Sequence, residues 1–284
     1  MKVVGDQLHF SASDLAGYLN CRHLSGLEHA AAKGNLAKPK YYDPLLEALW
    51  ERGIKHEHDY VDHLASLGLQ VVRINGVEVT DEAVAATIEA MTSGADVIVQ
   101  GALRSGSWVG RADILRKVVA PSGLGAWSYE AVDTKLARET KGGTVLQLCL
   151  YSELIGDIQG LMPEFAHVVP PWSEFVPERY RLADFGAYYR QVKGGMAASF
   201  ASRDPQETYP EPVTHCDICV WSTSCEKQRR DDDHLCLVAG ISSLQIAELK
   251  EHGVATGTQL AELALPLPWK PERGSLESFA RIRE

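Results

Sequence analysis

The sequence predicts an α/β protein in which helices flank a mixed β-sheet. Three observations support this class. Apolar residues recur at helical spacing through much of the chain up to residue 92, three strand-like stretches separated by glycine turns follow, and a helical and a strand-like stretch come next. Such an order is typical of helices packed against a sheet. At 284 residues and 45% hydrophobic composition, the chain can form one large core with a small appendage.

Helical patterns precede the strands, and they cover 11–33, 44–68 and 81–92. Ser11 or Ser13 can cap the first helix, because a hydroxyl accepts a hydrogen bond from a backbone N–H of the first turn. Cys21 is expected at or near the end of that helix. The second pattern has apolar residues at helical spacing and includes His56 and Glu57. The third is amphipathic.

Strands are expected at 96–103, 108–119 and 127–135, and another at 165–169. The first three should be neighbouring antiparallel strands, because glycine turns separate them. Two further helices are expected at 144–155 and 182–201. The strand at 165–169 would then return to the same sheet.

The C-terminal part is expected to form a small helical module. A helix around 243–251, a turn at Gly253-Val254 and another short helix resemble a helix-hairpin-helix, and a generic helical pair fits the same residues equally well. We therefore expect a main domain at 1–235 and the helical module at 236–265. For 266–284 we expect no stable structure, only a linker or the start of a further region.

The formal net charge of −10 argues against broad, nonspecific adhesion to nucleic acid, which depends on basic surface. It does not exclude DNA as a substrate, because a basic groove can be local. Basic residues concentrate in the middle of the chain, at Arg104, Arg111, Arg116, Lys117, Lys135, Arg138 and Lys141. A solvated charged face is the commoner explanation of such a group. No run of about 18 apolar residues occurs, so we expect no membrane span or signal peptide and a cytoplasmic protein.

Asp113, Asp133 and Lys135 are the candidate catalytic residues. They lie on two neighbouring predicted strands, and residues two apart share a strand face, so the three side chains can point toward one site. Two carboxylates can hold Mg²⁺ or Mn²⁺, which activates water against a phosphodiester, while a lysine orients that water or stabilises charge on the phosphate. Gln147 and Tyr151 share a helix face, from which they could hydrogen-bond the lysine, a phosphate or the DNA end.

Cysteines occur at two widely separated places, with Cys21 near the start and a C-x2-C-x5-C pattern at Cys216, Cys219 and Cys225. In a reducing compartment, clustered thiols more often bind metal than form disulfides. The spacing leaves two alternatives open, a zinc site completed by Cys21, His215 or His234, and an iron-sulfur cluster. Cys149 lies in an apolar run and is expected in the core.

Four short motifs make the chain resemble the RecB-type branch of the PD-(D/E)XK nuclease superfamily, and all come in the family order. They are Gly53-x-x-His56-Glu57, Gly110-x-x-Asp113, Asp133-Thr134-Lys135 and Gln147-x-x-x-Tyr151. The resemblance implies a restriction-endonuclease-like core in which Lys135 is the catalytic lysine. The implied ligands of the catalytic Mg²⁺ or Mn²⁺ are His56, Asp113, Asp133 and the backbone carbonyl of Thr134.

Two more carboxylates lie close to these motifs in the sequence. Glu57 follows the motif histidine, and Glu130 precedes the D-x-K motif. Either could support a second metal or an outer contact. Glu130 ranks lower because it has the strand parity of Thr134 and should face away from Asp133.

The cysteine arrangement adds to the resemblance. RecB-like nucleases of the AddB type, and those associated with CRISPR adaptation, have one cysteine before the nuclease core and three after it. The resemblance therefore implies a [4Fe-4S] cluster bound by Cys21, Cys216, Cys219 and Cys225. Such a cluster would join the N- and C-terminal segments of the nuclease domain in a structural role.

The combined expectation is an iron-sulfur deoxyribonuclease acting as an exonuclease on single-stranded or frayed DNA ends, with 5'-to-3' polarity favoured by the resemblance. The alternative is a noncatalytic DNA-binding module that delivers substrate to a helicase or another nuclease, and the intact acidic site argues against it. A zinc-stabilised structural protein is a third, less favoured hypothesis. The chain has no G-x4-G-K-[ST] loop, so it shows no ATP-driven motor of its own. DNA is the expected partner, and a helicase or a further C-terminal domain is another candidate.

Overall fold

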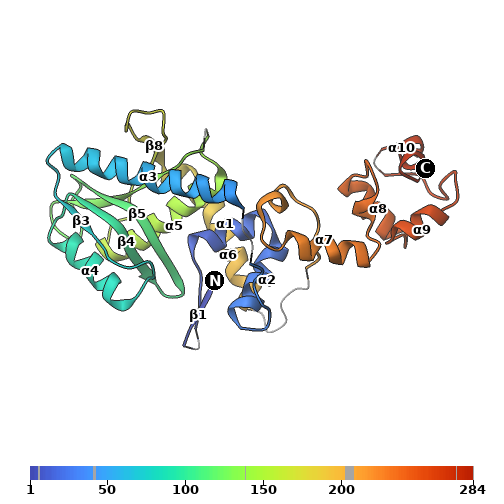
Figure 1. The fold of residues 1–284 in the computed structure, drawn as a ribbon, viewed down its shortest axis with the longest axis horizontal. Helices are drawn as coiled ribbons and strands as arrows, with labels where there is room; N and C mark the ends of the chain where they lie inside the picture. The colour runs from blue at the N-terminus through green and yellow to red at the C-terminus, as the bar shows by residue number, and fades with distance from the viewer. Residues whose placement is uncertain (6, 41–42, 138, 202–207, 273, 284) are drawn as a thin grey trace. The chain divides into compact units, whose positions relative to one another are not determined.

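The computed structural model describes residues 1–5, 7–40, 43–137, 139–201, 208–272 and 274–283. By their contacts they divide into two compact units (Figure 1). Unit 1 comprises Met1–Ala37 and Tyr41–Gln206, and unit 2 comprises Lys38–Lys40 and Glu207–Glu284. Within the described ranges, no helix has both the length and the apolar character needed to cross a membrane.

A six-stranded mixed sheet forms the centre of unit 1. Its spatial order is β3 (Val71–Arg73), β4 (Val97–Ser105), β5 (Trp108–Val118), β6 (Ser128–Thr134), β7 (Phe165–Val169) and β8 (Glu178–Arg181). The pairs β3–β4 and β6–β7 are parallel, and the other three are antiparallel. Parallel neighbours need a crossover, which α4 (Asp81–Thr92) and α5 (Gly142–Gln159) supply. The mixed α/β class and the three adjacent antiparallel strands are confirmed.

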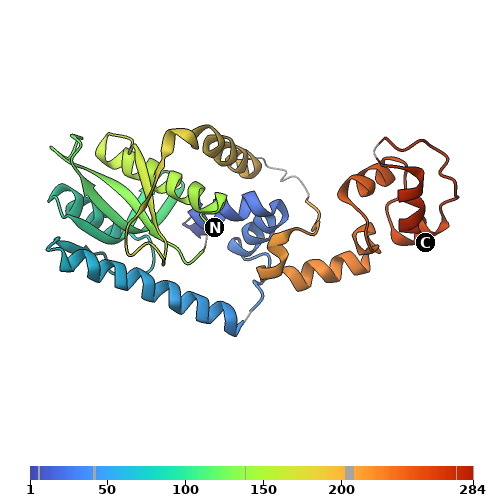
Figure 2. The same ribbon diagram turned by 90° about the horizontal axis from the view of Figure 1, so that it is seen from above.

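The two faces of the sheet have separate cores (Figure 2). On one face lies α3 (Pro44–Ser66), whose Tyr60, Val61 and Leu64 are buried against strand valines and Ile114. On the other face α5 packs on β4, β5 and β6, together with α1 (Ala12–Asn20) and α6 (Gly186–Ala201). Because α5 is covered on nearly all sides, most of its residues from Val145 to Ile155 are buried. Cys149 is 2% exposed in this core, as predicted.

The helical pattern at 11–33 is interrupted, so two helices replace the expected continuous one. Ser11 caps α1 in a capping box with Asp14. Cys21 is extended (φ −160°, ψ 113°) and ends α1, as expected, and its Sγ accepts a hydrogen bond from Leu24 N at 3.4 Å to begin α2 (Arg22–Ala32). A thiol acting as an N-cap has no strong sequence signal, which explains why a separate helix beginning directly after Cys21 was not predicted.

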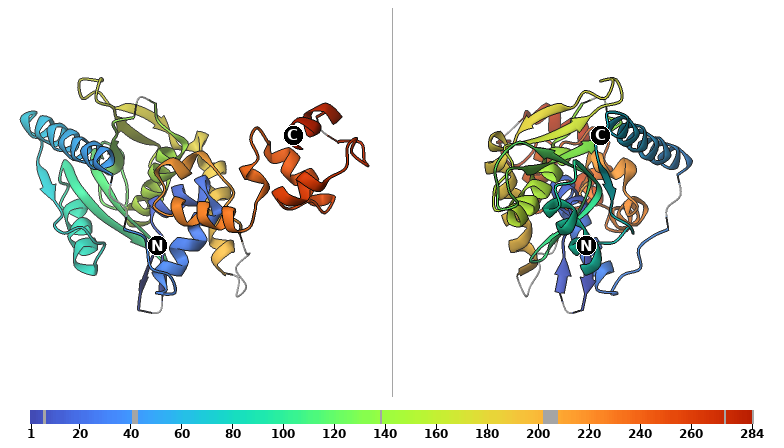
Figure 3. Two further views of the ribbon diagram at one scale, coloured as in Figure 1. Left: turned by 45° about the vertical axis from the view of Figure 1, so that its right-hand side comes forward. Right: turned by 90° about the vertical axis from the view of Figure 1, so that its left-hand side faces the viewer.

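Several short elements of unit 1 were not expected. The hairpin of β1 (Lys2–Val4) and β2 (Gln7–His9) lies at the bottom of both panels of Figure 3. The strands β3 and β8 are three and four residues long and lie at the two edges of the sheet. A stretch that short shows no alternation, so sequence periodicity could not reveal it. The helix expected at 182–201 is a 3₁₀ turn, η1 (Leu182–Asp184), followed by α6.

Unit 2 is helical around its own apolar core. Its elements are η2 (Thr214–Ile218), α7 (Ser222–Asp231), η3 (Leu235–Leu237), α8 (Ser243–Glu251), α9 (Gly257–Glu262) and α10 (Leu276–Arg283). The expected helix at 243–251 and the second short helix are confirmed. The absence of stable structure expected for 266–284 is wrong, because Phe279 and Ile282 of α10 are buried in the core with Leu249 and Leu260. The expected domain limits stay a prediction.

Candidate active site

Asp113 and Asp133 come together on the neighbouring strands β5 and β6. Ile114 pairs with Val132, and this antiparallel register places the two aspartates next to one another. Asp133 is 1% exposed. Its pKa is raised well above the usual range, first by burial and then by the charge of Asp113 and a hydrogen bond with it. The two carboxylates are therefore close enough to oppose each other's ionisation.

Lys135 completes this group from the end of β6. Its Nζ is 2.9 Å from Asp133 Oδ2 and donates to Asp133 Oδ1 at 3.1 Å. Burial lowers the pKa of Lys135, but the charges of Asp133 and Asp113 more than offset this, and the pKa rises above its usual value. The backbone N–H of Thr134 donates to Asp113 Oδ2 at 3.2 Å, which fixes one carboxylate oxygen toward β6. The predicted grouping of these side chains is confirmed.

A cleft of about 610 Å³ lies beside the group. From α3 it is lined by Leu49, Trp50, Gly53, Ile54 and Glu57, and from the strands by Asp113, Thr134 and Lys135. Trp50 is 68% exposed and Leu49 is 42% exposed. The cleft thus has the charged groups of Asp113, Lys135 and Glu57 on its walls and the exposed apolar side chains of Leu49 and Trp50 on the α3 side.

The two adjacent motif residues of α3 point to different partners. His56 Nε2 lies 2.9 Å from the carbonyl oxygen of Val169, and its ring stacks near Phe175. Glu57 lines the cleft, and its pKa is raised by burial and by the charge of Asp113. Across the described residues, no three His, Cys, Asp or Glu side chains form a group that could hold a metal ion. Metal ligation by His56 therefore stays a prediction.

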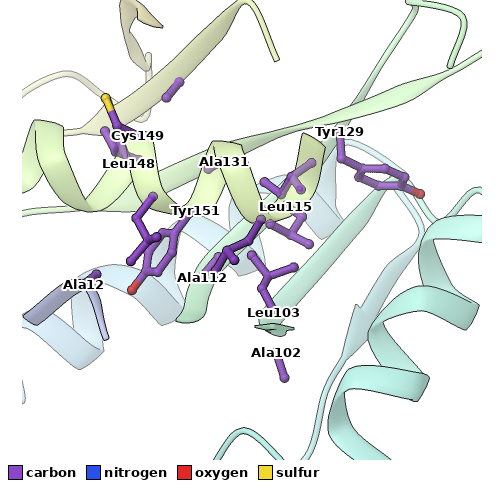
Figure 4. Packing of buried hydrophobic residues seen from close by; sticks show 14 of the residues in the cluster. Ala12, Ala102, Leu103, Ala112, Leu115, Tyr129, Ala131, Leu148, Cys149 and Tyr151 are labelled. Carbon is purple, nitrogen blue, oxygen red and sulfur yellow. The ribbon is translucent and has the colours of Figure 1, made fainter. Parts of the chain in front are cut away.

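Gln147 and Tyr151 of α5 lie on the opposite side of the carboxylates. Gln147 Nε2 donates to the Tyr151 hydroxyl at 3.1 Å, so the predicted pair is formed. Burial, followed by the charges of Asp113 and Asp133, raises the pKa of Tyr151. Figure 4 shows the Tyr151 ring beside Ala112 of β5 in the core. A Cβ at Gly110 would lie 2.7 Å from Tyr151 Cε1, so this glycine makes room for the ring.

Glu130 contacts strand β7 and does not line the cleft. Its Oε2 is 2.7 Å from His167 Nε2, and its Oε1 accepts a hydrogen bond from Phe165 N at 3.2 Å. These contacts tie β6 to β7 and leave Glu130 without a role at the Asp113–Asp133 pair.

Several members of the basic cluster have partners away from the cleft. Arg104 pairs with Asp81 at 2.5 Å, and Lys117 pairs with Asp96 at 2.6 Å. Arg111 donates to backbone carbonyls of Ile74, Asn75 and Glu78. Lys135 is the member of the set that lines the cleft, and Arg138 lies outside the described residues. Local ion pairs and contacts with backbone carbonyls thus occupy Arg104, Lys117 and Arg111.

The cysteines lie in short, locally ordered segments. Cys216 lies in η2 and its Sγ accepts a hydrogen bond from Val213 N at 3.4 Å, Cys219 directly follows η2, and Cys225 lies on α7. His234, one of the residues considered for zinc, is 5% exposed and has partners on both ring nitrogens. Its Nδ1 accepts from Cys236 N at 3.2 Å, and its Nε2 is 2.9 Å from Lys250 Nζ. His234 is therefore occupied within the core of unit 2.

Comparisons with known proteins add little to this geometry. No protein-family model matches the chain, and no curated protein matches it. A solved structure described as "Crystal structure of SSO0001" is similar over 78% of this chain and 88% of its own, with 14% sequence identity and a TM-score of 0.35. A likeness at this level carries no argument about function.

Two residues of the site were missed by sequence reasoning. Gln100 of β4 donates its Nε2 hydrogen to Glu57 Oε1 at 2.7 Å. Its signal was a polar side chain directly after the apolar run Val97–Val99 in a predicted strand. Trp50 is the other. It lies four residues after Leu46 and four before Ile54, so in the sequence it could not be told from the apolar face of the predicted helix.

Proposed function

We propose that this chain is a metal-dependent deoxyribonuclease with a restriction-endonuclease-like core, which hydrolyses phosphodiester bonds at single-stranded or frayed DNA ends. The observation that carries the proposal is the meeting of Asp113, Asp133 and Lys135 beside a cleft. The four ordered motifs supply the reaction class by resemblance. The same resemblance is the basis for proposing 5'-to-3' polarity.

The carboxylate pair has the chemistry that a divalent cation requires. Asp133 Oδ2 is buried and, although Lys135 Nζ is near, it has no hydrogen bond within the described structure. When both are ionised, the two carboxylates beside one ammonium group carry net negative charge in a poorly solvated place. A hard cation with oxygen ligands offsets that charge. Asp113 and Asp133 would hold Mg²⁺ or Mn²⁺, with His56 and the Thr134 carbonyl as further proposed ligands.

When bound, the cation would lower the pKa of a coordinated water and polarise the phosphodiester. The remaining work falls to residues of the chain. Lys135 is 32% exposed and keeps its proton because of the adjacent aspartates, so its ammonium group can pair with a phosphate oxygen in the cleft. Gln147 and Tyr151 hold each other by a hydrogen bond on α5. Lys135 places positive charge where negative charge develops.

The cleft rim supports an unpaired strand as the substrate. Trp50 and Leu49 expose apolar surface next to the charged group. An unpaired base can stack on an exposed indole, whereas a base inside a duplex is already stacked on its neighbours. A strand whose phosphate meets Lys135 could therefore place an adjacent base on Trp50.

The [4Fe-4S] cluster is proposed from the resemblance, with Cys21, Cys216, Cys219 and Cys225 as its ligands and a structural role. Four cysteine thiolates are the usual ligands of such a cluster. Anaerobic purification followed by iron and sulfide analysis tests it. Zinc without sulfide would overturn this part of the proposal and leave the nuclease assignment standing.

The decisive experiment measures cleavage of end-labelled single-stranded DNA with Mg²⁺ or Mn²⁺. We expect Asp113→Ala and Lys135→Ala to lower the rate by at least about 100-fold. Matched controls are Asp59→Ala and Lys55→Ala, which remove an exposed ion pair of α3. Equal cleavage by all variants would refute the site assignment. Binding of DNA without any cleavage by the wild type would instead support the noncatalytic module.

A further inference from the structure

Strand β4 is distorted at Gln100, opposite the acidic site. On either side of this residue, Val99 pairs with Ile114 of β5 and Gly101 pairs with Ala112, while Gln100 is skipped in the pairing. Its φ is +56°. Of the four described non-glycine residues with positive φ, Gln100 alone lies in a β-strand. Because L residues with a Cβ are strained in this region, the surroundings must hold the conformation.

The distortion changes the face toward which Gln100 points. Val97 and Val99 pack on the α3 face of the sheet, and Ile98 packs on the α5 face. Regular alternation would send the side chain of Gln100 toward α5. Instead, its amide reaches Glu57 on α3 at 2.7 Å. The left-handed backbone therefore puts two consecutive side chains on the same face.

This arrangement gives the carboxylate of Glu57 a hydrogen-bond donor. Glu57 lines the cleft with Asp113 and Lys135, and it is half-buried. The Gln100 amide holds one of its carboxylate oxygens, Oε1, by a hydrogen bond of 2.7 Å. Without the donor, a glutamate with three rotatable bonds could turn out of the cleft to solvent.

We infer that Gln100 is a positioning residue, which holds the carboxylate of Glu57 in the cleft that Asp113 and Lys135 line. The strained backbone is retained because a relaxed strand would direct the amide to the wrong face. This inference rests on the proposed metal-dependent function. It predicts that Gln100 and Glu57 act as one unit on cation affinity, although Gln100 itself need not touch the cation.

The test is Mn²⁺ affinity of the whole chain, measured by titration calorimetry without DNA. Gln100→Ala and Glu57→Gln should each weaken Mn²⁺ binding by about tenfold, as loss of an outer-shell partner commonly does. The double variant should be no weaker than either single variant, because the second change removes nothing further. Effects that multiply in the double variant, or affinities equal to the wild type, would overturn the inference.

A second measurement separates the effect of backbone strain at residue 100 from the effect of losing the amide donor. Gln100→Gly and Gln100→Ala both lack the donor, but only glycine adopts the left-handed conformation freely. The glycine variant should melt a few degrees higher than the alanine variant while binding Mn²⁺ equally weakly. Equal melting temperatures would refute the strain. If the alanine variant does not fold, the glycine variant still carries the affinity test.

The outcomes distinguish this inference from the proposed function. If the wild type binds no Mn²⁺ and cleaves no DNA, both are wrong. If the wild type binds and cleaves, and Gln100→Ala and Glu57→Gln bind Mn²⁺ like the wild type, only the positioning role is wrong. A stability loss without a change in affinity would assign Gln100 a purely structural role.

Discussion

Replacing Gly110 with alanine should destabilise the protein through a clash with Tyr151. A Cβ at this position would lie 2.7 Å and 2.8 Å from two ring carbons of Tyr151, and 3.3 Å from Leu154 Cδ1. Neither side can yield easily. Gly110 is paired with Leu103 in the sheet, and the Tyr151 ring is 7% exposed on α5. The added methyl group must therefore displace the ring or bend the strand.

The expected magnitude follows from two opposing effects. Overpacking of a core costs about 1–3 kcal/mol. Alanine reduces the entropy of the unfolded chain relative to glycine, which offsets about 0.4–1 kcal/mol. We expect a net loss of about 1–2 kcal/mol in the free energy of unfolding, or roughly 2–8 °C in melting temperature. Cleavage should fall as well, because a displaced Tyr151 no longer packs beside Asp113 and Asp133.

Urea unfolding of four proteins provides the assay: the wild type, Gly110→Ala, Tyr151→Ala and the double variant. In the Tyr151→Ala background the ring is absent, so the alanine at 110 should cost nothing. Gly194→Ala is the matched control, since nothing lies within 4 Å of its added Cβ and it is in helix α6, where alanine should stabilise by about 0.5–1 kcal/mol. A destabilisation that persists without the ring would refute the reasoning.

Four further predictions follow. Asp133→Asn should stabilise the metal-free protein to urea by on the order of 1 kcal/mol, because it removes a buried charge that Asp113 opposes, and it should abolish cleavage. Burial raises the pKa of Tyr129 to about 12, so the folded state keeps a proton that the unfolded state loses above pH 10. Stability should fall by about 2–3 kcal/mol as pH rises from 10 to 12, and Tyr129→Phe should flatten that fall. Trp50→Ala should weaken binding of single-stranded DNA about tenfold in anisotropy titrations with EDTA, whereas Tyr188→Ala, exposed on α6, should not. Cys225→Ser should lower the iron content of anaerobically purified protein, and unchanged iron would argue against that ligand.

Most regular elements were predictable because they carry their own periodic signal. The helix at 81–92 and the strands at 108–119 and 165–169 agree with the structure to within a residue. Their apolar residues repeat with the period of the element, and that repeat is independent of the rest of the fold. The edge strands and the break at Cys21 lack such a repeat, and the repeat of helix α10 covers eight residues only. They form because neighbouring chain segments supply hydrogen-bond partners or an apolar surface.

The pairing of Asp113 with Asp133 was also accessible from the sequence. Two neighbouring strands and the two-residue period of a strand suffice to bring an aspartate and a D-x-K motif together. The same parity argument placed Glu130 on the other face, where the structure has it bound to His167. Local rules succeed here because a β-ladder converts sequence position directly into spatial position.

The sequence by itself determined the α/β class, the order of the main elements and the identity of Asp113, Asp133 and Lys135 as a group. Only the tertiary structure decided that Glu57 lines the cleft while its neighbour His56 contacts the Val169 carbonyl, and that Gln100 points to α3. The physical reason is that helix rotation about its own axis is set by packing between layers. In addition, a single residue with a left-handed backbone sends its side chain to the other face of the sheet, and the two-residue period of the strand sequence does not reveal this.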